Sequence, residues 1–206
     1  MVAGKEHWEK VYTGKSPQSV SWFQPSAETS LRLIRQAAPP TAAIIDVGGG
    51  ASTLADGLLD AGYRRLTVLD LAGSALAAAQ ARLGARAAEV KWIESSILDA
   101  PLPRHAYDVW HDRAVFHFLT DPAERAAYVR QVLHALRPGG HVIVASFAED
   151  GPEKCSGLPV MRYRPDALHA EFGAPFTLLR HERETHLTPA GANQQFVYCY
   201  CRRSDG

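Results

Sequence analysis

An acid followed closely by three glycines stands out in the stretch AAIIDVGGGASTLADGL, residues 42–58. Asp46 lies at the end of an apolar run, glycines fill positions 48–50, and a helix-like pattern follows. Backbone N–H groups in such a turn point toward a ligand, and ligands bind at this end of a parallel strand. Asp70 ends the next strand-like run, where a carboxylate can accept hydrogen bonds from both hydroxyls of a ribose. These residues therefore predict a site for a ribose-containing ligand.

The residues around the glycines argue against two other kinds of nucleotide site. Dinucleotide sites use G-x-G-x-x-G, whose third glycine lets the helix pack closely against the strand, and here Thr53 takes that position. No G-K-[ST] follows the turn, so the turn is not a phosphate-binding P-loop. A nicotinamide-dependent oxidoreductase is consequently disfavoured.

A second set of reactive side chains, His111, Asp112 and Arg113, ends a later apolar run. An imidazole titrates near neutral pH, so His111 is a candidate for contacting a substrate or for removing its proton. Arg113 can hold an acidic substrate with two parallel hydrogen bonds, or it can simply pair with Asp112. We expect His117, a few residues later, to be a packed residue rather than a catalytic one.

Alternating strands and helices would position both sets of residues. The strand-like runs are residues 42–47, 65–71, 89–94, 106–111 and 141–147, and the helical patterns are residues 52–61, 73–85 and 121–136. The last of these helices has Asp121 as its N-cap and Pro122 at its first position. Alternation of this kind predicts a parallel sheet covered by helices on both faces.

After residue 150 the rhythm changes, because a loop is followed by a short helix at 165–172 and by two strand candidates, 175–184 and 194–201. The turn-rich segment between the two candidates predicts an antiparallel pair at one edge of the sheet. Ahead of the first strand, a helix is expected over about residues 26–37. We interpret the leading segment as a cap or lid.

The chain has 206 residues, which is most simply one domain, 1–206, with a sizeable core. Its 22 Lys and Arg balance its 22 Asp and Glu, so we expect no nucleic-acid partner. No apolar run approaches the length of a membrane span or a signal-peptide core, and we expect a cytoplasmic protein without a membrane partner. The three cysteines, Cys155, Cys199 and Cys201, contain no CxxC pair, and we expect free thiols and no metal site.

Four stretches, IIDVGGGAST, VLDLAGSAL, YDVWHDRAVFHFL and LRPGGHVIVASF, occur in register between residues 40 and 150. Together they resemble the class I S-adenosylmethionine-dependent methyltransferases. The resemblance implies a Rossmann-like, doubly wound α/β fold with a mostly parallel seven-stranded sheet, a C-terminal antiparallel hairpin and helices on both faces. It also implies S-adenosylmethionine as the cofactor, a cap at 1–40, a cofactor-binding core at 41–150 and a substrate-side segment at 151–206.

The resemblance further implies roles for individual residues. Asp46 would organise contacts near the amino group of the cofactor's methionine part, Asp70 would bind the ribose, and Leu71 would lie against the adenine. Ser96 stands where an Asp often receives the adenine amino group, a role that falls to Asp99 in the alternative. The cofactor-binding residues expected in this way are Asp46, Gly48, Gly49, Gly50, Asp70, Leu71, Ser96, Ile97 and Trp22.

In the same family the acceptor binds beyond the end of the fourth strand, so the resemblance places His111, Asp112 and Arg113 in the catalytic site. Methyl transfer is an in-line displacement, in which the protein mainly aligns the acceptor and excludes water. Trp8 and Tyr12 share one face of the leading helix, and in related enzymes such a segment covers the cofactor.

We expect a small-molecule acceptor, because a chain of 206 residues leaves no large domain for substrate recognition. A protein side chain such as lysine is an alternative acceptor. Cys155 and Arg162 are expected near the acceptor, and the three cysteines resemble the thiol clusters of arsenite methyltransferases, which suggests a thiol or metalloid acceptor. A cofactor-binding protein without catalysis is the remaining alternative.

Overall fold

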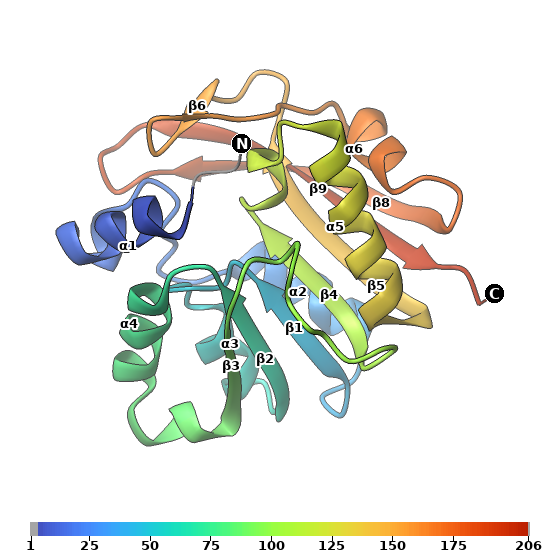
Figure 1. Ribbon diagram of the computed structural model, residues 1–206, viewed down its shortest axis with the longest axis horizontal. Helices are drawn as coiled ribbons and strands as arrows, with labels where there is room; N and C mark the ends of the chain where they lie inside the picture. The colour runs from blue at the N-terminus through green and yellow to red at the C-terminus, as the bar shows by residue number, and fades with distance from the viewer. Residues whose placement is uncertain (1–3, 206) are drawn as a thin grey trace.

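A computed structural model describes residues 4–205 of the chain, and one seven-stranded sheet forms its centre, in the order β3-β2-β1-β4-β5-β9-β8 (Figure 1). The strands are β1 (Ala43–Val47), β2 (Arg65–Asp70), β3 (Val90–Glu94), β4 (Tyr107–Arg113), β5 (Leu136–Phe147), β8 (Phe176–Leu187) and β9 (Asn193–Arg203). Strands β1 to β5 pair in parallel, and β9 pairs antiparallel with both β5 and β8. The predicted mostly parallel sheet with a C-terminal antiparallel hairpin is confirmed.

Helices cover both faces of this sheet. They are α1 (Lys5–Gly14), α2 (Glu28–Ala37), α3 (Leu54–Asp60), α4 (Gly73–Leu83), α5 (Pro122–Ala135) and α6 (Pro165–Phe172). Helices α5 and α6 pack on one apolar cluster and α2, α3 and α4 on another, and in Figure 1 α5 lies in front of the sheet and α2 behind it. Neighbouring residues of β4 and β5 alternate between the two clusters, as successive side chains of a strand must.

Local sequence explains where the best-defined helix begins. The Asp121 carboxylate accepts a hydrogen bond from the amide of Ala123 at 2.8 Å, and Pro122 occupies the first helical position of α5. Both features were predicted, because Asp satisfies an orphan amide and proline lacks the N–H that would be orphaned.

The start of β5 differs from the prediction of a strand at 141–147, because the strand already begins at Leu136, directly after α5. Leu136 pairs with Tyr107 and His141 with Val109, so the residues between them bulge out of the ladder. Gly139 has a φ of +73° in this bulge, a conformation that glycine adopts without strain. The stretch LRPGG is therefore an irregular part of the strand rather than a loop ahead of it.

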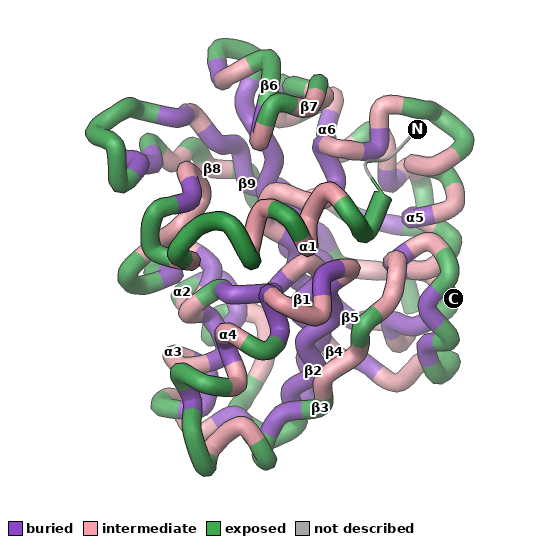
Figure 2. Tube along the Cα trace, turned by 60° about the vertical axis from the view of Figure 1, so that its left-hand side comes forward, coloured by how far each residue is buried: buried purple, intermediate pink, exposed green. Residues whose placement is uncertain are grey.

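The carboxyl ends of the parallel strands converge beneath the N-terminal segment. Figure 2 shows purple, buried strands in the middle of the molecule, with α1, whose residues are exposed (green) or intermediate (pink), lying across one end of them. A two-stranded hairpin not foreseen from the sequence, β6 (Lys154–Cys155) and β7 (Leu158–Pro159), stands at the same end. Within residues 4–205, no helix is long and apolar enough to cross a membrane.

Candidate cofactor and acceptor cleft

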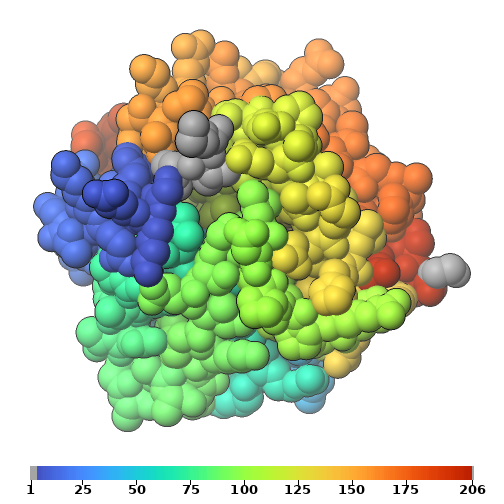
Figure 3. All heavy atoms as spheres, viewed as in Figure 1, coloured from blue at the N-terminus to red at the C-terminus, as the bar shows by residue number. Residues whose placement is uncertain are grey.

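A cleft with an empty volume of about 830 Å³ opens at the carboxyl ends of the strands, and we call it the main cleft. Figure 3 shows a hollow between the blue atoms of α1 and the green atoms on the opposite side. Six of the predicted cofactor-binding residues line it, namely Trp22, Gly48, Asp70, Leu71, Ser96 and Ile97. The fold therefore brings together residues at the carboxyl ends of β1, β2 and β3 with Trp22 of the N-terminal segment.

A smaller inner cavity of about 530 Å³ adjoins the main cleft. Tyr12, Trp22, Gly48 and Arg113 line both spaces, so the two are neighbours that share a wall. The other predicted residues that line the inner cavity are Asp46, Gly49 and His111. The predicted cofactor-binding residues are therefore divided between these two neighbouring spaces.

The glycine turn lies in direct contact with the two acids. Gly50 has a φ of +29°, and a Cβ added there would stand 2.5 Å from Oδ2 of Asp70. A Cβ at Gly49 would overlap Oδ2 of Asp46. Glycine is therefore required at these positions because the backbone approaches both carboxylates, which leaves them beside the amides of the turn.

Asp70 is a buried acid with spare capacity to accept hydrogen bonds. Its Oδ1 accepts from the amide of Ala72 at 2.9 Å. Burial raises its pKa to about 7, the Ala72 hydrogen bond opposes this rise, and the nearby charge of Asp46 adds to it. Two ribose hydroxyls would supply the donors that a buried carboxylate needs, so the residue fits the role that the resemblance implies.

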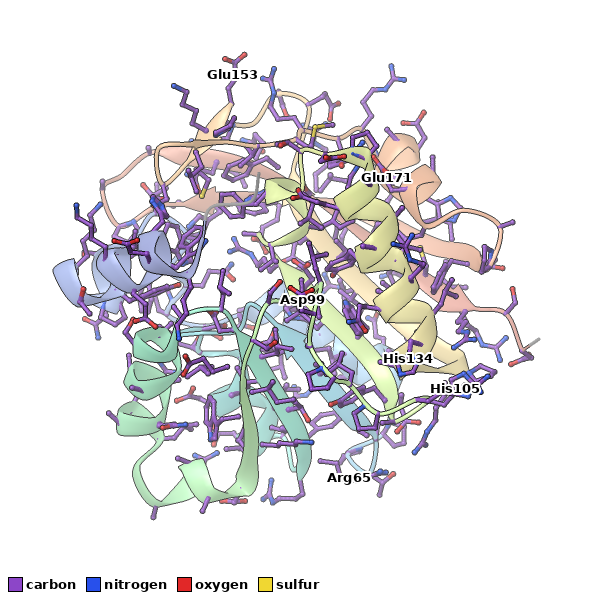
Figure 4. The ribbon with its side chains drawn as sticks, viewed as in Figure 1. Arg65, Asp99, His105, His134, Glu153 and Glu171 are labelled. Carbon is purple, nitrogen blue, oxygen red and sulfur yellow. The ribbon has the colours of Figure 1, made fainter. Side chains whose placement is uncertain are left out.

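The segment that follows β3 forms the side of the main cleft where the resemblance places the adenine. Ser96 Oγ accepts from the amide of Leu98 at 3.2 Å, and Ile97 lies between these two residues on the cleft wall. Asp99, the alternative to Ser96, is not among the lining residues that the structure describes. Figure 4 shows Asp99 near the carboxyl ends of the strands, whereas Arg65 and His105 lie at the opposite end of the sheet.

His111 lies on the inner cavity with both ring nitrogens engaged. Its Nδ1 is 2.7 Å from Oδ1 of Asp46, and its Nε2 is 2.8 Å from Oγ of Ser30. The side chain is 3% exposed. It therefore contacts the acid of the glycine turn rather than facing the main cleft, where the acceptor contact was predicted.

Arg113 extends between the main cleft and the inner cavity and pairs with Glu184 of β8. Its guanidinium donates to Oε1 of Glu184 at 3.1 Å and to the carbonyl of Trp22 at 3.2 Å, and it lies 4.1 Å over the ring of Phe196. The alternative pairing with Asp112 is wrong.

Asp112, predicted to lie in the catalytic site, is not among the described residues that line the main cleft or the inner cavity. Its carboxylate accepts from Tyr128 Oη at 2.6 Å and from the amides of Val115 and Phe116 at 3.0 and 3.1 Å, and it is fully buried. Strand alternation turns it to the face opposite His111 and Arg113. Burial raises its pKa to about 6, and the hydrogen bond from Tyr128 opposes this rise. Asp112 thus has a structural role, fixing the segment that follows β4.

Aromatic side chains form a further part of the lining of the main cleft. Trp8 packs edge-to-face on Trp22 and on Phe118, with ring centroids 5.9 and 5.0 Å apart, and Tyr12 Oη accepts from Trp22 Nε1 at 3.1 Å. Glu9 ties α1 to α4, because its carboxylate accepts from the amides of Gly73 and Ser74 at 2.7 and 3.2 Å. The leading helix therefore covers the cleft.

The cysteines occupy opposite faces of the sheet. Cys155 packs with the cluster under α2 to α4 and lines the main cleft, whereas Cys199 and Cys201 pack with the other cluster, their Sγ atoms 3.2 Å apart. The predicted resemblance to a three-thiol cluster is therefore wrong.

Arg162, which was expected near the acceptor, instead donates hydrogen bonds to Glu153 and to the carbonyl of Gly151. In residues 4–205 no group of three or more His, Cys, Asp or Glu could hold a metal ion.

Several residues of the site were not found from the sequence. Ser30, Tyr198 and Glu184 join the network of His111 and Arg113, and Glu9 anchors the cap. The sequence held no signal for Glu184, which lies in the charged stretch RHERE; only the structure shows that its side chain is 13% exposed, and a charge so buried calls for a partner. His117 is buried as predicted, and burial lowers its pKa to about 3.

Residues 44–140 match the family model described as a methyltransferase domain. No curated protein matches the chain. Among solved structures, a putative methyltransferase of Haloferax volcanii in complex with its Trm112 activator has a TM-score of 0.74 at 13% identity, covering 98% of this chain and 97% of that one.

Two further structures are similar over almost the whole chain. A structure from work on the conversion of a disulfide bond into a thioacetal group during echinomycin biosynthesis has a TM-score of 0.78 at 20% identity and covers 98% of this chain and 93% of its own. The 1,6-didemethyltoxoflavin-N1-methyltransferase of Burkholderia thailandensis, solved with 1,6-didemethyltoxoflavin and S-adenosylhomocysteine, has a TM-score of 0.68 at 18% identity, with 98% and 84% covered. The predicted fold and the resemblance are confirmed.

Proposed function

We propose, on the premise that the chain carries a methyltransferase domain with the class I fold and uses S-adenosylmethionine, that it transfers the methyl group to a small-molecule acceptor. The observation that carries the proposal is the composition of the main cleft. Gly48 of the glycine turn and Asp70 line it together with Trp8, Trp22 and Phe118, three packed aromatic residues that we call the aromatic chamber.

The residues present fit the cofactor along its length. Asp70 would accept from the ribose hydroxyls, and Leu71 and Ile97 would lie against the adenine. Asp46 would receive the ammonium group, because its Oδ2 is buried without a hydrogen-bond partner in the described part of the chain. A buried acceptor without a donor costs free energy, which a ligand N–H offsets.

The cofactor supplies a methyl group on a sulfonium, which an acceptor atom can displace without a protein nucleophile. Trp8, Trp22 and Phe118 would orient the acceptor and exclude water from the chamber. Both nitrogens of His111 are already hydrogen-bonded, and burial raises the pKa of the Cys155 thiol to about 12, so that it stays protonated. The chain therefore acts mainly by alignment, which suits an acceptor that is already nucleophilic.

The aromatic chamber favours a small-molecule acceptor over a protein side chain, because α1 covers the chamber and is tied to α4 through Glu9. A decisive experiment incubates the protein with cofactor labelled in the methyl group and a cell extract, and separates small-molecule from protein fractions. Label in the small-molecule fraction is expected. Label confined to protein would favour lysine-type acceptors, and tight cofactor binding without turnover over a broad acceptor panel would indicate a non-catalytic protein.

A further inference from the structure

A chain of buried hydrogen bonds runs from the glycine-turn acid into the body of the protein. Oδ1 of Asp46 is 2.7 Å from Nδ1 of His111, Nε2 of His111 is 2.8 Å from Oγ of Ser30, and Oγ of Ser30 is 3.3 Å from Oη of Tyr198. Each of the four residues comes from a different element, in the order β1, β4, α2 and β9. All four are at most 4% exposed.

The charge of Asp46 fixes the direction of its bond to His111, and a neutral imidazole then fixes the direction of the bond to Ser30. A carboxylate only accepts, so Nδ1 of His111 must donate to it. In the neutral imidazole the other nitrogen then accepts, and the Ser30 hydroxyl donates to it. Tyr198 has one hydroxyl hydrogen, and both Ser30 Oγ at 3.3 Å and Oε2 of Glu184 at 3.4 Å lie within reach of it. The donors of His111 and Ser30 therefore both point toward one oxygen of Asp46, and they hold the ring of His111 in one tautomer and one orientation.

The other oxygen of Asp46 has a different environment. Oδ2 is buried, has no hydrogen-bond partner within residues 4–205, and lies against the glycine turn beside Gly49. The terminal torsion of an aspartate is soft, so an untethered carboxylate would turn either oxygen toward the amides of the turn. Tethering Oδ1 removes that freedom and fixes Oδ2 as the oxygen left without a partner beside the inner cavity, which Asp46 lines.

We propose that His111 and Ser30 are positioning residues that act through Asp46: they hold Oδ1 so that Oδ2 meets the ammonium group at the amino-acid end of the cofactor. The inference rests on the proposed function only in taking S-adenosylmethionine as the ligand. It replaces the role of His111 as an acceptor base, since a base needs a free ring nitrogen facing the acceptor.

Ser30, His111 and Asp46 are hydrogen-bonded in the same succession as the Ser–His–Asp triad of hydrolases. The environment of Ser30, however, differs from that of a nucleophilic serine. Ser30 is 1% exposed on α2, and its Oγ is 3.3 Å from Tyr198 as well as 2.8 Å from His111. An attacking serine needs room for an acyl group at its oxygen, and this serine is enclosed. The serine supports the imidazole instead.

The test compares two ligands by calorimetry on the full chain: S-adenosylhomocysteine and its analogue without the α-amino group. His111→Phe removes the donor to Asp46, and we expect it to weaken S-adenosylhomocysteine binding by about tenfold while leaving the affinity for the deaminated analogue within about twofold. His111→Asn keeps an N–H near the position of Nδ1 and should restore most of the loss. Ser30→Ala should give a smaller loss with the same selectivity.

Two controls keep the experiment decisive. His117→Phe makes the same replacement at a fully buried histidine that is not among the described lining residues of either space, and it should leave both affinities unchanged. If His111→Phe does not fold, His111→Asn and His111→Gln form a matched pair, because the longer amide of Gln does not place its N–H at Nδ1. Asn should then retain the preference for the amino group, and Gln should lose it.

Equal losses for both ligands in His111→Phe, or no loss for either, would overturn the positioning role. In those outcomes the wild-type chain still binds S-adenosylhomocysteine, so the proposed function stands. If the wild-type chain binds neither ligand, the cofactor assignment fails and the positioning role fails with it.

Discussion

Cofactor affinity should depend on pH through Asp70. Burial raises the pKa of this carboxyl to about 7, and ribose hydroxyls donate best to its ionised form. If only the ionised form binds, the fraction able to bind is about one half at pH 7 and about one tenth at pH 6, so affinity for S-adenosylhomocysteine should fall about tenfold between pH 8 and 6. Asp70→Asn should abolish this dependence and weaken binding at pH 8 by about 1–3 kcal/mol, because a hydrogen bond to a charged group is lost.

Titration calorimetry at pH 6, 7 and 8 measures this effect directly. Performed in buffers of different ionisation enthalpy, it should also show a proton released on binding near pH 6. Asp112→Asn is the control, since that acid is also buried with a raised pKa but is bonded to the segment after β4 rather than to the cleft. A wild-type affinity that is flat from pH 6 to 8, or an unchanged slope in Asp70→Asn, would refute the reasoning.

The same shift has a consequence for the stability of the ligand-free protein. Between the ordinary pKa of 3.8 and the folded-state pKa of about 7, the unfolded chain has lost a proton that the folded protein keeps. The stability that this group contributes is therefore full below pH 3.8 and is lost as pH rises to about 7. Since one pKa unit corresponds to about 1.4 kcal/mol, Asp70→Asn should raise the free energy of unfolding at pH 8 by up to about 4 kcal/mol. Denaturant unfolding of the wild type and the variant would measure this difference. It equals the stability that the wild-type protein loses by keeping Asp70 charged.

Other changes separate the parts of the site. Gly50→Ala places a Cβ 2.5 Å from Asp70 Oδ2, so it should weaken S-adenosylhomocysteine binding about tenfold or more in titration calorimetry; unchanged affinity would contradict the close approach. Tyr128→Phe removes the 2.6 Å donor to Asp112 and should lower the free energy of unfolding by about 1–3 kcal/mol without changing ligand affinity, whereas a change in affinity alone would return Asp112 to the cleft. Trp8→Ala should raise the KM for the acceptor and leave S-adenosylhomocysteine affinity within about twofold, because Trp8 lines the aromatic chamber; the opposite pattern would place the cofactor there instead.

The sequence predicted the features that are local along the chain. Asp46, the glycine turn and Asp70 could be placed because a strand, a turn and a helix follow one another within a few residues, and ligands bind at the carboxyl ends of parallel strands. Even Asp112 was within reach, since strand alternation alone turns it away from His111.

The sequence did not reveal contacts between distant elements. Glu184 lies 71 positions after Arg113, and Ser30 lies 81 positions before His111, so the pairings depend on the place of β8 in the sheet and on how α2 packs against the sheet. The cysteines show the same limit, because alternation groups Cys199 with Cys201 but cannot tell that Cys155 packs on the opposite face.

The most direct test of the account is a crystal structure of the protein with S-adenosylhomocysteine. We expect the ribose hydroxyls within hydrogen-bond distance of the Asp70 carboxylate and the ammonium group at Oδ2 of Asp46. A main cleft without the compound at saturating concentration, or a ribose bound away from Asp70, would contradict it.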